Sequence, residues 1–133
     1  MIIKRRITII RTSKPLEKSI NNELQWLGIS LGLFNLRDKD KSCFRIFIEL
    51  LKSAKKGILL SSDEIAEKLA LSRGTVVHHL NKLMDSGLVI YTQRRYSLRV
   101  DKLENLIDEL ENDLKNSISE LKKVAVDIDN WLE

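Results

Sequence analysis

The spacing of apolar residues predicts a mainly helical chain. Leucine and isoleucine recur every three or four positions from Leu16 to about Leu27, and a second apolar stripe runs from about Lys41 to Ala54. Such spacing gathers the apolar side chains on one face of a helix. Pro15 suits a first helical turn, whereas Gly28 weakens the prediction beyond Leu27. Before these helices, Ile2 to Thr12 is rich in isoleucine and threonine, which predicts a strand.

The segment from Gly57 to Val100 has a distinct order of signals. A brief strand is expected at Ile58 to Leu60. Ser61 and Glu64 then form a Ser-x-x-Glu capping box, which predicts a helix over about Ser62 to Leu69. Ser72 is a good N-cap for a further helix that ends near Ser86, before Gly87. Two strands, Leu88 to Thr92 and Tyr96 to Val100, are expected around Gln93, Arg94 and Arg95 as a small basic hairpin.

From Asp101 onward no residue breaks the helix, and the apolar residues fall into heptads. One core position is filled by Val100, Ile107, Leu114, Leu121 and Ile128, and the other by Leu103, Leu110, Ser117, Val124 and Trp131. A helix of about 30 residues is about 45 Å long, too long to bury this seam on so small a body. We therefore expect a homodimer. The alternative is that the helix folds back on its own domain, aided by Leu106, Ile118, Ala125 and Leu132.

Composition and charge narrow the possible functions. Residues 1–100 contain 19 Lys and Arg against 9 Asp and Glu, net +10, whereas residues 101–133 contain 4 against 10, net −6. A basic body suits a polyanionic partner. The longest run without a charged residue, Leu24 to Leu36, is too short to span a bilayer, and no cleavage site follows the basic N-terminus, so a cytoplasmic protein without membrane contact is expected. The single cysteine, Cys43, is expected to be a buried apolar residue.

Two short helices followed at once by a basic hairpin are the order expected of a winged helix-turn-helix. The first helix braces the second, whose N-terminal residues can enter the major groove of B-DNA. The expected fold is therefore mainly α with a small β wing (α+β), a winged helix-turn-helix followed by a long C-terminal coiled-coil helix. Residues 1–38 are assigned to packing or dimerisation, 39–100 to DNA binding and 101–133 to dimerisation.

A family resemblance lies in the segment LSRGTVVHHLNKLMDSGLV. It resembles the recognition-helix segment of the ArsR-type and MarR-type winged-helix transcriptional regulators, especially those of archaea, over about Cys43 to Leu98. The matching positions are Ser72, Thr75, Val76, His79, Leu80, Leu83, Gly87, Leu88 and Val89. Val77 departs from the pattern, since similar proteins often have a small polar residue there. The resemblance implies a regulator that binds duplex DNA.

Helical spacing assigns Val76, Leu80, Leu83 and Met84 to the core and the opposite face to DNA. The expected DNA-binding residues are Ser72, Arg73, Gly74, Thr75, Val77, His78, Asn81, Lys82, Arg94 and Arg95. Arg73 is the first choice for reading a guanine edge; Ser72, Thr75 and Lys82 are expected to contact phosphate, and Val77 a thymine methyl. Arg94 and Arg95 are expected to contact phosphates or the minor groove from the wing at residues 92–96.

Metal and enzymatic chemistry are not expected. His78 and His79 are adjacent, so they lie about 100° apart on a helix and form no chelating pair. His79, nearer the core stripe, is expected to be packed, and His78 to face nucleic acid. The terminal helix has no histidine, and no phosphate-binding glycine loop, catalytic constellation or cofactor site is present in the sequence. The competing hypothesis is a winged helix used for protein contact, as in basal transcription factors or assembly scaffolds.

The N-terminal segment has two possible functions. Lys4, Arg5, Arg6 and Arg11 suit an arm that reaches DNA, whereas the isoleucines suit an edge strand that packs on the domain or across a dimer. We favour packing, because an arm for DNA has no need of so many isoleucines. The helix that contains Trp26 is expected to pack on the partner subunit and line a ligand pocket, although no polar constellation identifies an effector.

Overall fold

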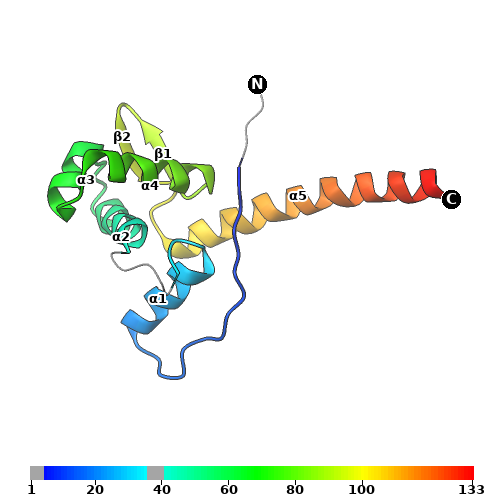
Figure 1. Cartoon of the computed structure of the whole chain (residues 1–133), viewed down its shortest axis with the longest axis horizontal. Coiled ribbons are helices and arrows are strands. Elements are labelled where there is room, and N and C mark those ends of the chain that lie inside the picture. The colour runs from blue at the N-terminus through cyan, green and yellow to red at the C-terminus, as the bar shows by residue number, and fades with distance from the viewer. Residues whose placement is uncertain (1–4, 36–40) are drawn as a thin grey trace.

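The computed structural model describes residues 5–35 and 41–133. This part of the chain forms five helices and one two-stranded antiparallel sheet (Figure 1). The elements are α1 (Ile20–Ser30), α2 (Ser42–Lys55), α3 (Ser62–Leu69), α4 (Arg73–Asp85), β1 (Val89–Thr92), β2 (Arg95–Leu98) and α5 (Leu103–Leu132). The fold class expected from the sequence is therefore confirmed.

The helix-turn-helix pair α3 and α4 begins at the two serines that the sequence indicated. The Ser61 hydroxyl accepts from the Glu64 amide at 3.1 Å, and the Glu64 carboxylate accepts from the Ser61 amide at 3.3 Å, which completes the capping box. Ala70 ends α3 in a left-handed conformation, φ 54°, and Ser72 caps α4. α2 packs against α3, α4 and β2, so it fixes the helix pair and the wing relative to each other.

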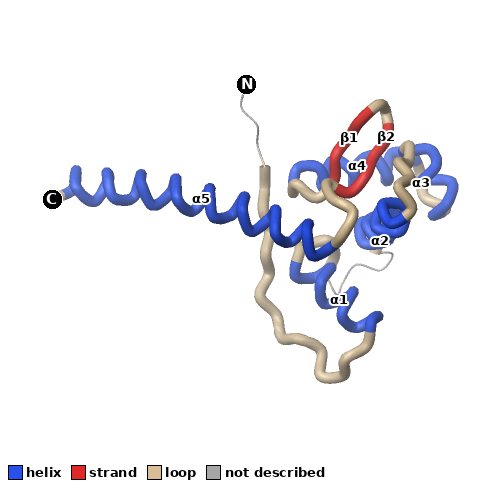
Figure 2. The backbone as a smooth tube through the Cα atoms, turned by 180° about the vertical axis from the view of Figure 1, so that it is seen from behind, coloured by secondary structure: helices blue, strands red, loops and turns tan. Residues whose placement is uncertain are grey.

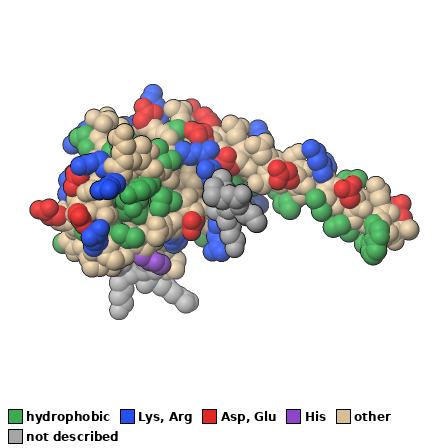
Figure 3. All heavy atoms as spheres, turned by 90° about the horizontal axis from the view of Figure 1, so that it is seen from above, with side chains coloured by type: hydrophobic (Ala, Val, Ile, Leu, Met, Phe, Trp, Pro, Cys, Tyr) green, Lys and Arg blue, Asp and Glu red, His purple; other side chains and the backbone are tan. Residues whose placement is uncertain are grey.

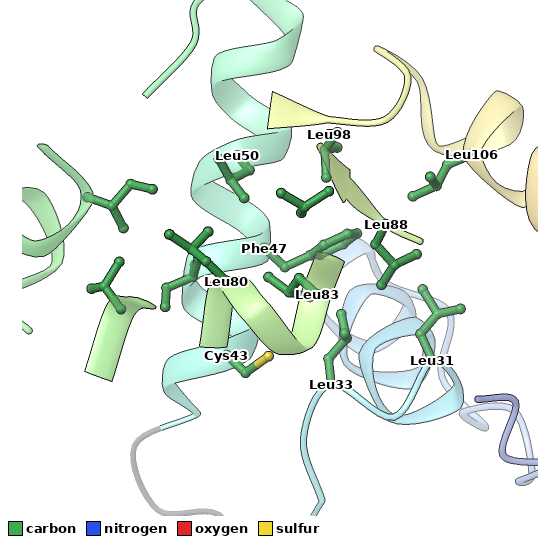
Figure 4. Close-up of a cluster of buried hydrophobic side chains, with 14 of the residues drawn as sticks. Leu31, Leu33, Cys43, Phe47, Leu50, Leu80, Leu83, Leu88, Leu98 and Leu106 are labelled. Carbon is green, nitrogen blue, oxygen red and sulfur yellow. The ribbon is translucent and has the colours of Figure 1, made fainter. Parts of the chain in front are cut away.

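One hydrophobic core joins all these elements (Figure 4). Phe47 of α2, Ile65 of α3 and Leu80 and Leu83 of α4 have no exposed surface. Leu106 of α5 is equally buried. Leu31, Leu33 and Phe34, which follow α1, belong to the same core, so the N-terminal segment is not packed separately. The predicted core residues Val76, Leu80 and Leu83 are buried, Met84 is half-buried, and Cys43 is buried as a free thiol.

The first helix differs from its predicted bounds, Leu16 to Leu27. It begins only at Ile20, because the Ser19 side chain accepts from the Asn22 amide at 3.1 Å and caps the helix there. Pro15 therefore lies outside the helix. It also continues through Gly28 to Ser30: a Cβ at Gly28 would lie 2.7 Å from ring carbons of Phe34 and Phe44. The glycine is required for this close approach rather than as a helix end.

The strand predicted from Ile2 to Thr12 is wrong over its described residues. Residues 5–12, here called the N-terminal arm, are extended but pair with no strand. Instead the Arg6 amide donates to the Asp85 carbonyl at the end of α4, and the Ile10 amide donates to the Ser30 carbonyl at the end of α1, each at 2.8 Å. Carbonyls in the last turn of a helix lack intrahelical partners, so the arm satisfies two of them. Figures 1 and 2 show this arm crossing α5.

The brief strand expected at Ile58 to Leu60 is reduced to one bridge. Only Leu60 pairs, exchanging two backbone hydrogen bonds of 3.1 and 2.7 Å with Tyr96 of β2. Ile58 and Leu59 remain exposed on the surface. The apolar run therefore ends in an attachment point for the wing rather than in a third strand.

The long helix α5 divides into a docked part and a projecting part. Leu106 and Leu110 are buried against the body, and Leu103 and Leu114 are half-buried, whereas residues 115–133 are all exposed. Leu110 was expected at the dimer seam but is buried within its own chain. The alternative prediction, a helix that folds back on its own domain, is therefore correct for the turns from Leu103 to Leu114. Val100 precedes the helix and Ser117 is exposed. Figure 3 shows hydrophobic side chains along one side of the projecting part.

Charged groups fasten the docked part of α5. Arg99, just after β2, lies 2.7 Å from a Glu109 carboxylate oxygen and 2.5 Å from one of Asp113. Arg5 of the arm approaches the same Asp113 oxygen at 3.5 Å. The hydrogen bonds from Arg99 lower the pKa of Asp113 and raise the pKa of Arg99 itself. The Asp113 carboxylate of α5 therefore joins the arm, through Arg5, to the residue that follows the wing, Arg99.

This cluster predicts a pH-dependent stability. Because the pKa of Asp113 is lower in the folded state, its contribution is present above the ordinary aspartate pKa and is lost as the pH falls through the folded pKa. Asp113→Asn should reduce the free energy of unfolding by about 1 kcal/mol at neutral pH. The difference from wild type should vanish in acid. Urea denaturation across a pH series measures it.

Glu111→Gln is the matched control, since this exposed acid has only a 3.9 Å pair with Lys115 one turn away. Its effect should stay within a few tenths of a kcal/mol. Equal losses in the two variants, or a loss in Asp113→Asn that persists unchanged in acid, would contradict the role given to Asp113.

Candidate nucleic-acid interface

The start of α4 is set by hydroxyl groups. The Ser72 side chain accepts from the Thr75 amide at 3.1 Å and donates to the Thr75 hydroxyl at 2.8 Å. These contacts satisfy an amide that has no partner within the helix. The helix therefore begins at Arg73, with its positive dipole end and the Ser72 hydroxyl on the surface. Such an end favours an anion.

Burial of one stripe decides which face of α4 is free. Val76, Leu80 and Leu83 are completely buried, so the opposite side of the helix is turned to the surface. Eight of the residues predicted to bind DNA lie on this helix or at its cap. Two of them, Thr75 and Val77, are half-buried. The others are exposed: Ser72, Arg73, Gly74, His78, Asn81 and Lys82. The structure thus brings together the residues that spacing assigned to one face. Ser86, expected to end the helix, caps it instead.

Gly74 lies on this exposed face in open surroundings. A Cβ built there meets no heavy atom within 4 Å. Its φ is not in the left-handed region, so neither packing nor backbone conformation within the described chain requires glycine. The missing side chain leaves the backbone of the first helical turn open to close approach by a large partner.

Arg73 has a replaceable partner. Its Nε lies 3.4 Å from a carboxylate oxygen of Asp63, but both side chains are more than 70% exposed, at 73% and 72%. An ion pair in this setting contributes little because water screens it. The guanidinium is therefore able to leave Asp63 for a phosphate or a base edge.

The wing is tighter than the sequence predicted. β1 and β2 pair in register from Val89 with Leu98 to Thr92 with Arg95, so the turn has only two residues. These are Gln93 and Arg94, whose φ angles of 52° and 64° are both left-handed, as a type I′ hairpin requires. Arg94 is thus at the exposed tip. No carboxylate pairs with it among residues 5–35 and 41–133.

Arg95 lies in β2 rather than at the tip where the sequence put it. Its guanidinium pairs with the Glu64 carboxylate and donates to the Leu59 carbonyl at 3.2 Å. Glu64 also caps α3, and the hydrogen bonds from Ser61, followed by that from Arg95, lower the pKa of its carboxyl. Arg95 therefore fastens the wing to the start of α3.

The two histidines differ in exposure. His78 is exposed and His79 is half-buried, with ring centroids 5.3 Å apart in an edge-on arrangement. Helical spacing had predicted this difference. The described residues contain no group of three or more His, Cys, Asp or Glu side chains placed to hold a metal ion.

A pocket of about 600 Å³ lies beside α1 and the start of α5. Leu24, Leu27 and Leu103 line it together with Trp26, whose indole nitrogen donates to the Thr12 carbonyl at 3.3 Å. Trp26 therefore lines a pocket, while the binding of a ligand there and the packing of α1 on a partner subunit stay predictions. Lys14 and Lys18 also contribute to the lining, but no polar arrangement there specifies a ligand.

The basic residues of the N-terminal arm were expected to be less important for DNA contact than for packing. Arg5 and Arg6 line a groove with His78, Asn81 and Lys82 of α4. No local signal in the sequence connects positions so far apart, since only the docking of the arm on the end of α4 brings them together. Because the isoleucines of the arm favoured a packing strand, the sequence did not indicate that its arginines lie beside α4.

The contact of Arg95 with Glu64 predicts a difference between the two wing arginines. Arg95→Ala should speed hydrogen exchange of the β1 and β2 amides, because the wing loses its side-chain attachment to α3. Arg94→Ala, the matched control at the tip, should leave that exchange unchanged. Exchange followed by NMR or mass spectrometry measures it, and equal protection in both variants would show that Arg95 does not hold the wing.

Comparison with known proteins agrees with this architecture. Residues 49–91, from the second half of α2 to β1, match the model of the family described as bacterial regulatory protein, arsR family. No curated protein and no solved structure matches the chain. No helix among the described residues is long and apolar enough to cross a membrane. The matched segment is thus similar to the DNA-binding domain of arsR-family regulators, in agreement with the winged helix-turn-helix arrangement of α3, α4 and the β1–β2 hairpin.

Proposed function

We propose that the protein is a sequence-specific regulator that binds double-stranded DNA as a homodimer. α4 enters the major groove, and the wing contacts the adjacent backbone or minor groove. The observation that supports this most strongly is the exposed face of α4, where Gly74, His78 and Asn81 lie opposite a fully buried stripe, with the exposed Arg73 at the N-terminal end of the helix. A helix fixed so firmly on one side presents the other side as a rigid reading surface.

Each residue of this face has a proposed contact. Arg73 exchanges Asp63 for the O6 and N7 atoms of a guanine, the bidentate contact that arginine makes best. Val77, half-buried, offers its methyl groups to a thymine. Asn81 and His78 face base edges. Ser72, Thr75 and Lys82 contact phosphates and so set the position of the helix on the duplex.

On the wing, Arg94 and Arg95 are proposed to contribute unequally. Arg94 lies at the exposed tip of the hairpin, where its side chain can reach a phosphate or the minor groove. Arg95 reaches DNA only by exchanging its contact with Glu64. We therefore expect the larger direct contribution from Arg94.

Dimerisation is proposed to use the projecting part of α5. Its exposed apolar residues include Leu121, Val124, Ile128 and Trp131, at the spacing of a heptad seam. They continue the same helical stripe that Leu103, Leu106 and Leu110 bury against the body. An apolar stripe of this length is costly in water, and a second copy of the same helix covers it with matching residues. Ile107 and Leu114 extend the seam towards the body.

These assignments give the chain three functional segments. Residues 1–38 serve packing or dimerisation, 39–100 bind DNA and 101–133 dimerise. Two copies place two recognition helices on half-sites about one helical turn apart, so the preferred site is near-palindromic. A cytoplasmic location is part of this proposal, because a microbial cell holds its DNA there.

DNA binding is tested with short duplexes by fluorescence anisotropy across a salt series. The affinity of the wild type should fall steeply with salt. On a selected site, Arg73→Ala should weaken binding about 5- to 150-fold, and Arg94→Ala should reduce the slope of log affinity against log salt by about 1. Lys123→Ala, which removes an exposed charge from the far part of α5, is the control and should change neither quantity.

Two outcomes of this experiment would contradict the proposed DNA binding. If the wild type does not bind duplexes at low salt, or if both arginine variants bind as the wild type does, the winged helix is a protein-contact module. The partner search would then begin with the exposed stripe of α5.

Dimerisation is tested by analytical ultracentrifugation. Leu121→Asp should raise the dimer dissociation constant about 100-fold or more, because two buried leucines per dimer become charged. Asn116→Asp adds the same charge on the polar side of α5 and should leave the dimer intact. A wild type that sediments as a monomer at all concentrations, or a dimer insensitive to Leu121→Asp, would remove the seam from the proposal.

A further inference from the structure

The N-terminal arm is held beside the recognition helix by specific contacts. The Arg6 amide donates to the Asp85 carbonyl, and the Ile10 amide to the Ser30 carbonyl. Between them, Thr8 packs on Gly32, where a Cβ would lie 2.7 Å from the Thr8 methyl and φ is +72°. Arg5 pairs with Asp113 of α5. The arm is therefore attached to α4, to α5 and to the turn after α1.

This attachment creates a groove of about 790 Å³ between the arm and the second half of α4. We call it the arm groove; Arg6 and Thr8 line it from the arm, and His78, Asn81, Lys82 and Asp85 from α4. Most of these side chains are hydrogen-bond donors. Three of the four α4 residues belong to the proposed reading face, so the groove opens on the C-terminal half of that face.

Among the described residues, two cations of the arm groove, Arg6 and Lys82, have no acidic partner, whereas Arg5, which also lines it, pairs with Asp113. Among the described residues, no carboxylate lies within ion-pair distance of Arg6 or Lys82. Asp85 is the acid among the lining residues, and its backbone carbonyl already accepts from Arg6. Arg6 and Lys82 line the same groove, and two cations without an acidic partner make it electrostatically suited to an anion.

The geometry of B-DNA indicates which anion. A helix with its side chains is about 10–12 Å across, and the major groove is about 12 Å wide. A helix lying in that groove therefore has a phosphate backbone along each flank. The arm docks on the C-terminal end of α4 through the Arg6 amide and the Asp85 carbonyl, so a backbone that passes this end of the helix lies between the arm and α4.

We propose that the arm groove holds the phosphate backbone of one DNA strand, clamped between Arg6 of the arm and Lys82 of α4. This inference rests on the proposed DNA-binding function and adds the N-terminal arm to the interface. It gives the arm the role of a second wall for the backbone, facing the wall that α4 provides. The basic residues of the arm then act on DNA while its backbone packs on the body.

The test measures the salt dependence of duplex binding for Arg6→Ala. The backbone amide that docks the arm is retained in this variant, so only the side-chain charge is lost. Loss of one phosphate contact should reduce the slope of log affinity against log salt by about 0.9. Arg6→Lys, which retains the charge, should keep most of the slope. Asp85→Asn should strengthen binding severalfold, because it removes a carboxylate from the path of the backbone.

Arg11→Ala is the matched control, since Arg11 is an exposed arginine of the same arm outside the arm groove. It should leave the slope unchanged. Equal effects of Arg6→Ala and Arg11→Ala would reduce the arm to a diffuse source of positive charge and would overturn the clamp. Tighter binding by Arg6→Ala would overturn it as well, since the arm would then shield α4 from DNA.

Two further readouts separate the possible explanations. Failure of the wild type to bind duplexes contradicts the proposed function, whereas normal binding with a full slope in Arg6→Ala contradicts only the clamp. Inorganic pyrophosphate titrated into the DNA-free protein tests a free phosphorylated molecule as the source of the anion. Tight pyrophosphate binding that depends on Arg6, with an unchanged DNA slope, would assign the groove to such a molecule instead.

Discussion

Burial of the inner stripe of α4 is the constraint on which the other features depend. Val76, Leu80 and Leu83 are fully buried, and the same core contains Phe47 of α2 and Ile65 of α3. A helix buried this completely along one side has no rotational freedom about its axis, because any turn would expose leucine and open a cavity. The opposite face, which includes Gly74, His78 and Asn81, is therefore fixed in space by the packing of the buried side. Rigid presentation of this kind lowers the entropy cost of binding a partner.

Around this fixed helix, charged contacts set the positions of the wing, the arm and α5. Glu64 caps α3 and at the same time pairs with Arg95, so the start of one helix and the first residue of β2 share a carboxylate. Asp113 is shared in the same way by Arg99 and Arg5. In each case one acid joins segments that are far apart in sequence. These contacts are individually modest at a surface, but they decide where the peripheral segments lie relative to α4.

The distribution of charge along the chain matches the two proposed functions, DNA binding by the body and dimerisation by α5. The body contains the excess of Lys and Arg, and the exposed stripe of α5 is apolar with acids beside it. In the proposed dimer, each α5 uses its apolar side for the partner helix, while its acidic surface repels DNA. The duplex is then directed to α4, the wing and the arm groove, so that one fold separates self-association from nucleic-acid contact.

Local signals in the sequence determined the helix-turn-helix itself. Ser61, Glu64 and Ser72 act through neighbours three residues away, so capping identified α3 and α4, and helical spacing identified their buried faces. The same locality explains the errors: isoleucine-rich residues at the N-terminus predict a strand, but a strand needs a partner strand that the fold does not supply. Only the tertiary structure decided that the arm docks on the end of α4, that Arg95 faces Glu64, and that α5 leaves the body after Leu114. Each of these depends on contacts between residues distant in sequence, and such contacts produce no periodic pattern of apolar and polar residues from which they could be predicted.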